Sequence, residues 1–379
     1  MKTVFFFLSL FFLATSSYAN EGRVCQKCHP IIYDEYYKSS HRKASTVNNP
    51  IHKAIWEVHA DDAKTYTCAK CHSPNDLKAL NNGILGNNKV QKEEPISCIY
   101  CHTIKNVQEG ESSNTNILSG KKREFYTAEL PKKGKDKASY ETKTSWFGLI
   151  KESRNSPYHK IDYNNENFYN GNVCMGCHSH VNNKHNFDIT MLDASIDKND
   201  KNTCVSCHMP QVAGTKVTIN ETKTHAFHGI AGIYHMNKEM GKHIEFKIDT
   251  SNNGFNVRVI NKSNHALFGQ AFREGVLNVS IMRDAKEIKL KSFIFARVLG
   301  RDGVELKPKD IFKANETIRD TLIYTKKDIM YTNKLQAGDK LRVTLSVRRL
   351  STMAAKELDL QDNKDVVKKR ILKVQIFSF

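Results

Sequence analysis

The sequence predicts an α + β protein of two domains, a mainly α-helical and loop domain followed by an antiparallel β-sandwich. Two observations carry this prediction. All ten cysteines lie before residue 208, in short segments separated by helical or polar stretches. From about His243 onward, apolar and polar residues alternate with the period of a β-strand. The chain therefore changes character near residue 243, and its 379 residues are enough for two domains.

Five copies of the pattern Cys-x-x-Cys-His use every cysteine of the chain. Two thiols three residues apart lie on one side of a helical turn and can both add to the vinyl groups of one haem. The histidine that follows is then placed to bind the iron. The sequence thus predicts five c-type haems (haem c, with iron). Their attachment residues are Cys25, Cys28, Cys68, Cys71, Cys98, Cys101, Cys174, Cys177, Cys204 and Cys207, and their proximal ligands are His29, His72, His102, His178 and His208.

Two other chemistries also use paired cysteines. A disulfide framework would suit an exported chain, but it gives no role to a histidine after every second cysteine. Zinc ribbons join Cys-x-x-Cys pairs at spacings such as that between Cys68 and Cys98, yet they do not need the adjacent histidine. Haem attachment accounts for the cysteines and the histidines together.

Residues 1–19 are typical of a cleaved signal peptide. Lys2 precedes an apolar run from Val4 to Leu13, and small residues, Ser17 and Ala19, follow at the positions that a signal peptidase reads. The apolar run, about ten residues, is too short to cross a bilayer. We predict cleavage after Ala19, a mature protein without a membrane span, and a periplasmic location.

The chain is strongly basic. It has 58 basic and 40 acidic residues, which gives a formal net charge of +18. Such a balance is typical of nucleic-acid binding in isolation, but export argues against that partner. Haem propionates would offset part of the excess. We expect the remaining charge to attract acidic redox partners or small anions, and we predict no binding to nucleic acid.

Candidates for the distal iron ligands come from the 11 histidines that remain after the five in the motifs. Pro30 is suited to the first turn of a helix, and His41 continues the face of His29 along that helix. An unbroken helix would put the two histidines roughly 18 Å apart, so His41 is predicted to bind a neighbouring haem. In the next predicted helix, residues 50–64, we favour His59 over His52.

The motifs also form a degenerate repeat. Cys68 and Cys98 are as far apart in the chain as Cys174 and Cys204. A serine-containing segment that ends in a histidine precedes each pair, with His41 before the first pair and His159 before the second. His159 is therefore a second distal candidate.

The domain boundaries follow from these patterns. The haem domain spans residues 20–242, and within it residues 103–145 form a polar, basic stretch that we interpret as a surface insertion. Residues 243–379 contain about seven alternating apolar runs separated by turn signals. With no helices of a parallel sheet between them, these strands favour an immunoglobulin-like sandwich, in which only residues 351–369 are expected to be helical or irregular.

Several segments resemble known multihaem cytochromes. The Cys25–His29 motif, with Tyr33, Ser40 and His41, is similar to the opening haem segment of the tetrahaem electron carriers of hydroxylamine oxidoreductase. Related multihaem cytochromes have a C-terminal β-sandwich. The Cys204–His208 motif with the following Met209-Pro210 and His225-Ala226-Phe227 is similar to a segment of that superfamily, which implies that His225 is a distal ligand.

The resemblance extends to the β domain. Relatives often carry an asparagine, then Gly-His-x-x-Pro-Thr-Gly, then an arginine, and this chain has Asn261, residues 264–269 and Arg273. The glycine, proline and threonine of that pattern are missing here, and the remaining residues imply His265 as a candidate ligand. The distal candidates in order of preference are His41, His159, His225, His59 and His265.

One departure bears on function. Pentahaem nitrite reductases attach their active-site haem through a motif with lysine in place of histidine, and no such motif occurs here. We therefore predict a periplasmic electron-transfer protein, with no catalytic residue assigned. Two alternatives stay open: an oxidoreductase acting on a small nitrogen or sulfur compound at one pentacoordinate haem, and a redox adaptor that docks through its β domain. The expected partners are electron-donor and electron-acceptor proteins, such as a membrane quinol-oxidising cytochrome or a periplasmic reductase.

Overall fold

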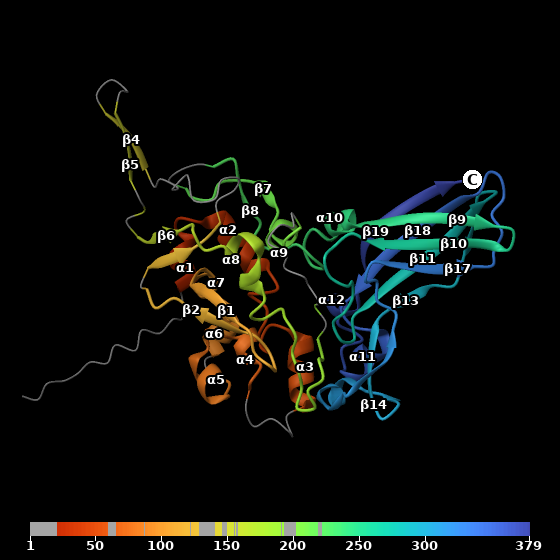
Figure 1. Ribbon diagram of the computed structural model, residues 1–379, viewed down its shortest axis with the longest axis horizontal. Helices are drawn as coiled ribbons and strands as arrows, with labels where there is room; N and C mark the ends of the chain where they lie inside the picture. Colours follow the sequence, from red (N-terminus) through yellow and green to blue (C-terminus); the bar gives the residue numbers. More distant parts are fainter. Residues whose placement is uncertain are drawn as a thin grey trace, which may run out of the picture.

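The computed structural model describes residues 21–59, 66–86, 88–121, 123–128, 141–145, 150–154, 156, 158–190, 192, 202–218 and 222–379. The predicted signal peptide lies outside these residues. Helices and short strands form one side of the molecule, and long antiparallel strands form the other (Figure 1). The architecture is therefore α + β. In the described part of the chain, no helix combines the length and the apolar character needed to cross a membrane.

The haem domain is built from short helices, most of which begin or end at a motif. Ser97 caps the helix of the third motif by accepting a hydrogen bond from the Tyr100 amide, and Thr203 and Ser206 form a capping box at the fifth. The elements are α1 (Glu21–Gln26), α2 (Pro30–Lys38), α3 (Pro50–His59), α4 (Ala69–His72), α5 (Leu77–Asn82), α6 (Asn88–Glu93), α7 (Cys98–His102), α8 (Asn167–Asn170), η1 (Asn172–Cys174) and α9 (Cys204–His208).

The first predicted helix is shorter than the sequence pattern suggested. Helix α2 begins at Pro30 as expected, but it ends at Lys38, because Ser39 turns to extended backbone with φ −68° and ψ 163°. The Ser39 side chain is fully buried. His41 therefore lies in the turn after the helix, and the estimate of its position along an unbroken axis does not apply.

Several strands lie among the described residues of the 103–145 stretch. Strands β1 (Ile104–Gln108) and β2 (Thr115–Leu118) form an antiparallel hairpin, and β3 (Glu124–Tyr126) pairs in parallel with β6 (Lys160–Asp162). From this hairpin, Asn114 donates to the Met175 carbonyl, 3.2 Å away inside the fourth motif. The hairpin thus supports a haem-attachment segment.

Strands β4 (Glu141–Ser145) and β5 (Ile150–Arg154) project from the domain in Figure 1, and β7 (Gln211–Ala213) pairs with β8 (Thr224–Ala226).

The long strands begin after α10 (Asn237–Met240) and η2 (Gly241–His243). Sheet order is β17-β10-β9 in one layer and β12-β11-β18-β19 in the other, with β13 beside β11 and a small sheet of β15-β14-β16. The strands are β9 (Ile244–Ser251), β10 (Gly254–Asn261), β11 (Glu274–Arg283), β12 (Lys286–Lys289), β13 (Phe293–Phe295), β14 (Arg297–Arg301), β15 (Val304–Glu305), β16 (Glu316–Asp320), β17 (Lys326–Tyr331), β18 (Lys340–Arg348) and β19 (Arg370–Ser378), with the 3-10 helix η3 (Pro308–Lys313).

One core lies between the two main sheets. Alternate residues of facing strands fill it, including Phe255 of β10, Leu277 of β11 and Leu345 of β18, none of which is exposed to solvent. At the rim, Arg283 donates to Asp339 from Nε at 2.8 Å and from Nη2 at 2.6 Å. Helices α11 (Thr352–Glu357) and α12 (Lys364–Val367) occupy most of the stretch that the sequence marked as helical or irregular.

The two domains share apolar contacts. Ile51, Ala54 and Ile55 of α3 pack against a buried cluster of the β domain that includes Ala355 and Val366. A second contact joins the segment around Ile189 to Leu299, Ile311 and Ala314. Both clusters join apolar side chains of the two domains, so burial of apolar surface holds the domains together.

Candidate haem sites

Backbone carbonyls orient three of the motif histidines. The Nδ1 atom of His29 lies 2.7 Å from the Lys216 carbonyl oxygen, and His102 and His208 make the same contact with Tyr126 and Ala231, also at 2.7 Å. A carbonyl accepts only from a protonated nitrogen, so each ring carries its proton on Nδ1 and leaves Nε2 free to bind a metal. The Tyr126 carbonyl comes from β3, within the stretch that the sequence suggested was only a surface insertion.

Four motif histidines face a second histidine from elsewhere in the chain. The ring centres are 6.3 Å apart for His29 and His159, 6.0 Å for His178 and His41, 6.3 Å for His102 and His228, and 6.2 Å for His208 and His265. Two imidazoles on opposite sides of one iron, each with a metal–nitrogen bond of about 2 Å, have ring centres roughly 6 Å apart. All four separations match this spacing.

The surroundings of these rings favour the form that binds iron. Burial lowers the pKa of His178 and of His228 to about 4. It also lowers the pKa of His41, His102 and His265. Imidazoles with depressed pKa values are neutral near pH 7, and a neutral imidazole is the species that coordinates metals. The residues present therefore fit haem iron, both by spacing and by protonation.

The second motif is arranged differently. His72 and His52 have ring centres only 4.1 Å apart, and their Nδ1 atoms approach the same Ala44 carbonyl at 3.1 and 2.9 Å. That separation leaves no space for an iron between the rings. Burial lowers the pKa of His52 to about 3, and the Nε2 atom of His52 lies 3.4 Å from the hydroxyl of Tyr66, which is fully buried.

His59 was the distal candidate that the sequence favoured near this motif. It is the last residue of α3, and its side chain lies outside what the structure describes. Among the described residues, His52 is the one imidazole in ring contact with His72. The described part of the chain therefore supplies no second imidazole at iron spacing for the second motif.

Among the described contacts, His225, the distal candidate implied by the resemblance, faces no motif histidine. Its ring is fully buried, with Nδ1 at 3.2 Å from the Gly214 carbonyl and Nε2 at 3.0 Å from a Glu35 carboxylate oxygen. Both nitrogens thus have protein partners. The other Glu35 oxygen accepts from the His228 amide at 2.8 Å, and it is His228, three residues further on, that faces His102. These contacts favour His228 over His225 as the ring opposite His102.

The β domain contributes the ring opposite the fifth motif. His265 lies in the loop after β10, and its Nδ1 atom is 2.9 Å from the Ala266 carbonyl. The Asn261 side chain fixes this loop by donating to three carbonyls, those of His265, Ile323 and Tyr324, at 2.7, 3.1 and 2.8 Å. The loop is therefore held by Asn261, whereas the histidine is available to the haem domain.

Cysteines of different motifs are in contact. Cys98 hydrogen-bonds with Cys25, Cys177 with Cys71, and Cys174 with Cys204; these contacts, with burial, raise the pKa of Cys98, Cys177 and Cys174. None of the ten cysteines, all within the described residues, forms a disulfide. The close approach at the fourth and fifth motifs requires a glycine. Gly171 has φ +83°, and a Cβ there would lie 2.7 Å from the Cys204 Cβ.

These motifs and histidine pairs define a class: the chain is a multihaem c-type cytochrome, which binds iron-containing c-type haems. Residues 24–103, with three of the motifs, match the family model of cytochrome c554 and c-prime. The structure is similar to that of a penta-heme cytochrome c552 from Thermochromatium tepidum, with a TM-score of 0.69, 19% identity, and coverage of 96% of this chain and all of that one. That likeness shows a shared fold over nearly the whole chain. No curated protein matches the sequence significantly.

Proposed function

We propose that this protein is a periplasmic electron carrier with five covalently bound haems, one at each motif. The observation that carries the proposal is the set of four histidine pairs at iron spacing, His29–His159, His41–His178, His102–His228 and His208–His265. Imidazoles on both faces leave an iron no position for a substrate. When bound, such haems supply one-electron redox chemistry at low potential. The penta-heme protein of similar fold supports the number five.

The polypeptide keeps the proposed sites close to one another. Cysteine contacts join the first motif to the third, the second to the fourth, and the fourth to the fifth. The Asn116 side-chain amide lies 3.2 Å from the Tyr100 hydroxyl in the third motif and 3.6 Å from the Cys177 sulfur in the fourth, so these two motifs also adjoin. Each motif therefore adjoins at least one other. Such an arrangement favours electron transfer from one haem to the next within the protein over electron transfer to small acceptors in the solvent.

The location and partners in this proposal rest on the sequence. Residues 1–19 are read as a signal peptide, and the net charge of +18 suits acidic donor and acceptor proteins, such as a membrane quinol-oxidising cytochrome or a periplasmic reductase. The β domain is proposed to be an immunoglobulin-like sandwich. Its structural role is to supply His265 and the apolar surface that covers α3.

The test is a count of haems and electrons on purified, haem-loaded protein. We expect five irons per chain and five one-electron reductions in a spectroelectrochemical titration. Rapid, reversible oxidation by a small acidic redox protein, slowing as salt rises, would support the carrier role. Sustained turnover of nitrite, hydroxylamine or sulfite with an artificial electron donor or acceptor would contradict it.

The second motif favours a second candidate function, an oxidoreductase acting on a small nitrogen or sulfur compound. The observation is the 4.1 Å spacing of His72 and His52, which leaves the far side of that iron without an imidazole from the described residues. His52 lies beside His72 and not across an iron from it, with its Nε2 atom 3.4 Å from the Tyr66 hydroxyl. A high-spin ferric signal that shifts on addition of nitrite, hydroxylamine or sulfite would favour this function. A high-spin signal that does not change on addition of these compounds would contradict this function.

A further inference from the structure

The imidazoles of His52 and His72 share one hydrogen-bond acceptor. The Nδ1 atom of His52 lies 2.9 Å from the Ala44 carbonyl oxygen, and the Nδ1 atom of His72 lies 3.1 Å from the same oxygen. The two ring centres are 4.1 Å apart, with the ring planes inclined by 50°. His52 and the proximal histidine of the second motif therefore compete for one carbonyl.

The protonation of both rings follows from this carbonyl. A carbonyl oxygen only accepts hydrogen bonds, so each ring carries a proton on Nδ1. In the neutral His52 ring the Nε2 atom is then an acceptor, which fits the Tyr66 hydroxyl 3.4 Å away. The Tyr66 hydroxyl thus donates to His52, and His52 donates to the carbonyl that His72 also uses.

Other motif histidines have acceptors of a different kind. Each of three places its Nδ1 atom 2.7 Å from a backbone carbonyl that no second histidine ring contacts in the described part of the chain, namely His29, His102 and His208. The contact of His72 is longer, at 3.1 Å. A carbonyl oxygen has two lone pairs and can accept from two rings, but the two donors share its negative charge. The hydrogen bond of His72 is therefore expected to be weaker than those of the other three.

The strength of this hydrogen bond bears on the iron that His72 would bind. An axial imidazole that donates strongly from Nδ1 becomes a more basic ligand, and a more basic ligand stabilises ferric over ferrous iron. Competition from His52 leaves His72 less basic. The ferrous state at the second motif is then favoured relative to a site in which His72 has the carbonyl to itself.

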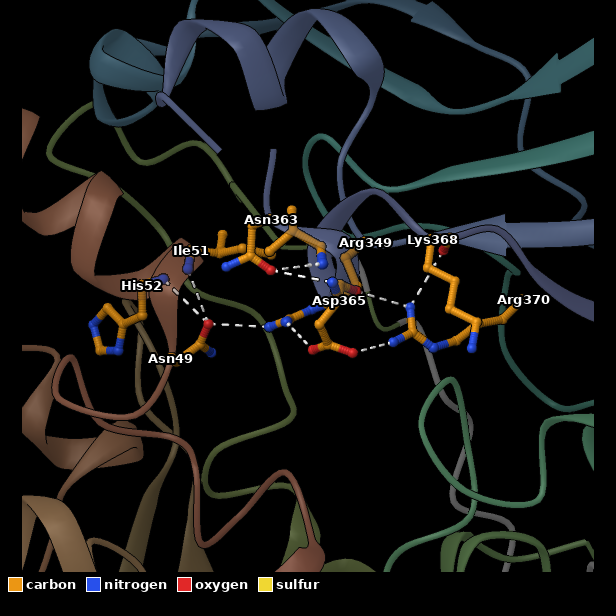
Figure 2. Close-up of polar contacts among 9 residues, drawn as sticks. Asn49, Ile51, His52, Arg349, Asn363, Asp365, Lys368 and Arg370 are labelled. Atoms are coloured by element: carbon orange, nitrogen blue, oxygen red, sulfur yellow. Dashed lines mark hydrogen bonds and ion pairs between the residues drawn. The ribbon is translucent and has the colours of Figure 1, made fainter. Parts of the chain in front are cut away.

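The β domain holds the helix that carries His52. The Asn49 Oδ1 atom accepts hydrogen bonds from the backbone amides of Ile51 and His52, at 3.2 and 3.4 Å, and from the Arg349 guanidinium at 3.0 Å. Figure 2 shows this oxygen between the first turn of α3 and Arg349, which also pairs with Asp365. Contacts with the β domain therefore help to fix where His52 lies.

We propose that His52 is a positioning residue for the haem at the second motif, whose reduction potential it raises by competing with His72 for the Ala44 carbonyl. The competition makes this haem a better electron acceptor than it would be without His52. The inference rests on the proposed function, which places a haem at this motif.

The experiment compares His52→Leu and His52→Asn with the unmodified haem-loaded protein in a redox titration followed by EPR. Leucine fills similar space but donates no hydrogen bond, so His72 keeps the carbonyl. The reduction equilibrium constant of one haem should then fall by about threefold to tenfold, the equivalent of one hydrogen bond. Asparagine can place its side-chain amide near the position of the imidazole Nδ1 atom, so His52→Asn should keep a constant close to that of the unmodified protein.

His235→Leu is the matched control. The Nε2 atom of His235 lies 3.1 Å from the Lys38 carbonyl, and its ring contacts Phe227 and no motif histidine among the described contacts. The same substitution there removes a hydrogen bond between a ring and a carbonyl without changing the acceptor of an iron ligand. We expect all potentials of His235→Leu to match those of the unmodified protein.

Three results would overturn the proposal. One is an unchanged or increased equilibrium constant in His52→Leu at full haem content; if that variant does not fold, His52→Phe, which also lacks a donor, is measured in its place. Another is an equal fall in His52→Asn, which would indicate that the ring acts by packing alone. The third is an equal fall in His235→Leu. Failure of the haem count itself, measured on the unmodified protein, would refute the proposed function instead.

Discussion

Replacing His265 by alanine tests whether the β domain completes a haem site. The ring of His265 is 6.2 Å from that of His208, with the two planes 19° apart, so its removal takes away the group on one side of a single iron. The Asn261 side chain holds the surrounding backbone through three hydrogen bonds, and these do not involve the imidazole. The substitution should therefore remove a ligand without unfolding the loop.

The expected magnitude follows from the number of sites. With five motifs in the chain, one haem in five should change from low to high spin in the ferric state, while covalent haem content stays the same. The assay is low-temperature EPR with quantified spin, together with the absorbance of the oxidised protein. His243→Ala is the control, since His243 ends η2, directly before β9, and faces no motif ring among the described contacts. An unchanged spin state in His265→Ala would refute the assignment.

Further substitutions test other parts of the molecule. His228→Ala is expected to convert one haem to high spin, whereas His225→Ala, which removes a partner of Glu35 and no iron ligand, should leave every spin state unchanged in the same EPR measurement. Gly171→Ala forces a left-handed residue to carry a Cβ 2.7 Å from that of Cys204 and should lower the free energy of unfolding by about 1–3 kcal/mol, more than Gly303→Ala, where the added Cβ meets nothing within 4 Å. Asp339→Asn should lower the thermal midpoint near pH 7. Because a hydrogen bond from its arginine partner holds the pKa of Asp339 at about 2, below the ordinary 3.8, that pair stabilises fully above pH 3.8 and loses its effect as pH falls through 2, where the two proteins should unfold alike.

Local chemistry made much of this molecule predictable. The haem motifs are contiguous in sequence, so their cysteines and proximal histidines can be identified without a fold. The two-residue period begins near His243, and the first of the long strands, β9, begins at Ile244. The alternation of apolar and polar residues is a local property of each strand, so it can be recognised in the sequence.

The distal histidines depend on contacts between distant segments. His41 lies opposite His178 and His159 lies opposite His29, so each histidine of the apparent repeat faces a motif from the other half of the domain. The spacing of residues along the sequence does not predict which distal histidine faces which motif histidine. The structure places His41, His159 and His265 opposite motif histidines, and their ligand role stays a prediction.

The segment around His225 shows that a family resemblance alone does not choose between two nearby histidines. The segment holds two histidines three residues apart, and the sequence gives both similar surroundings. Glu35 of α2 distinguishes them by binding the ring of one and the backbone amide of the other. Since Glu35 is far away in the chain, only the folded structure reveals this choice. The same holds for the β1–β2 hairpin, whose polar composition resembles a loop but whose asparagines contact the fourth motif.

The most direct test of the account is EPR of the fully oxidised, haem-loaded protein with each ferric signal quantified. Four histidine pairs at iron spacing and one motif without a second imidazole among the described residues predict four low-spin haems and one high-spin haem. Five low-spin signals would contradict the predicted high-spin haem and would indicate a sixth ligand from outside the described residues, where the side chain of His59 lies. Two or more high-spin haems would contradict the histidine pairing on which the electron-carrier proposal depends.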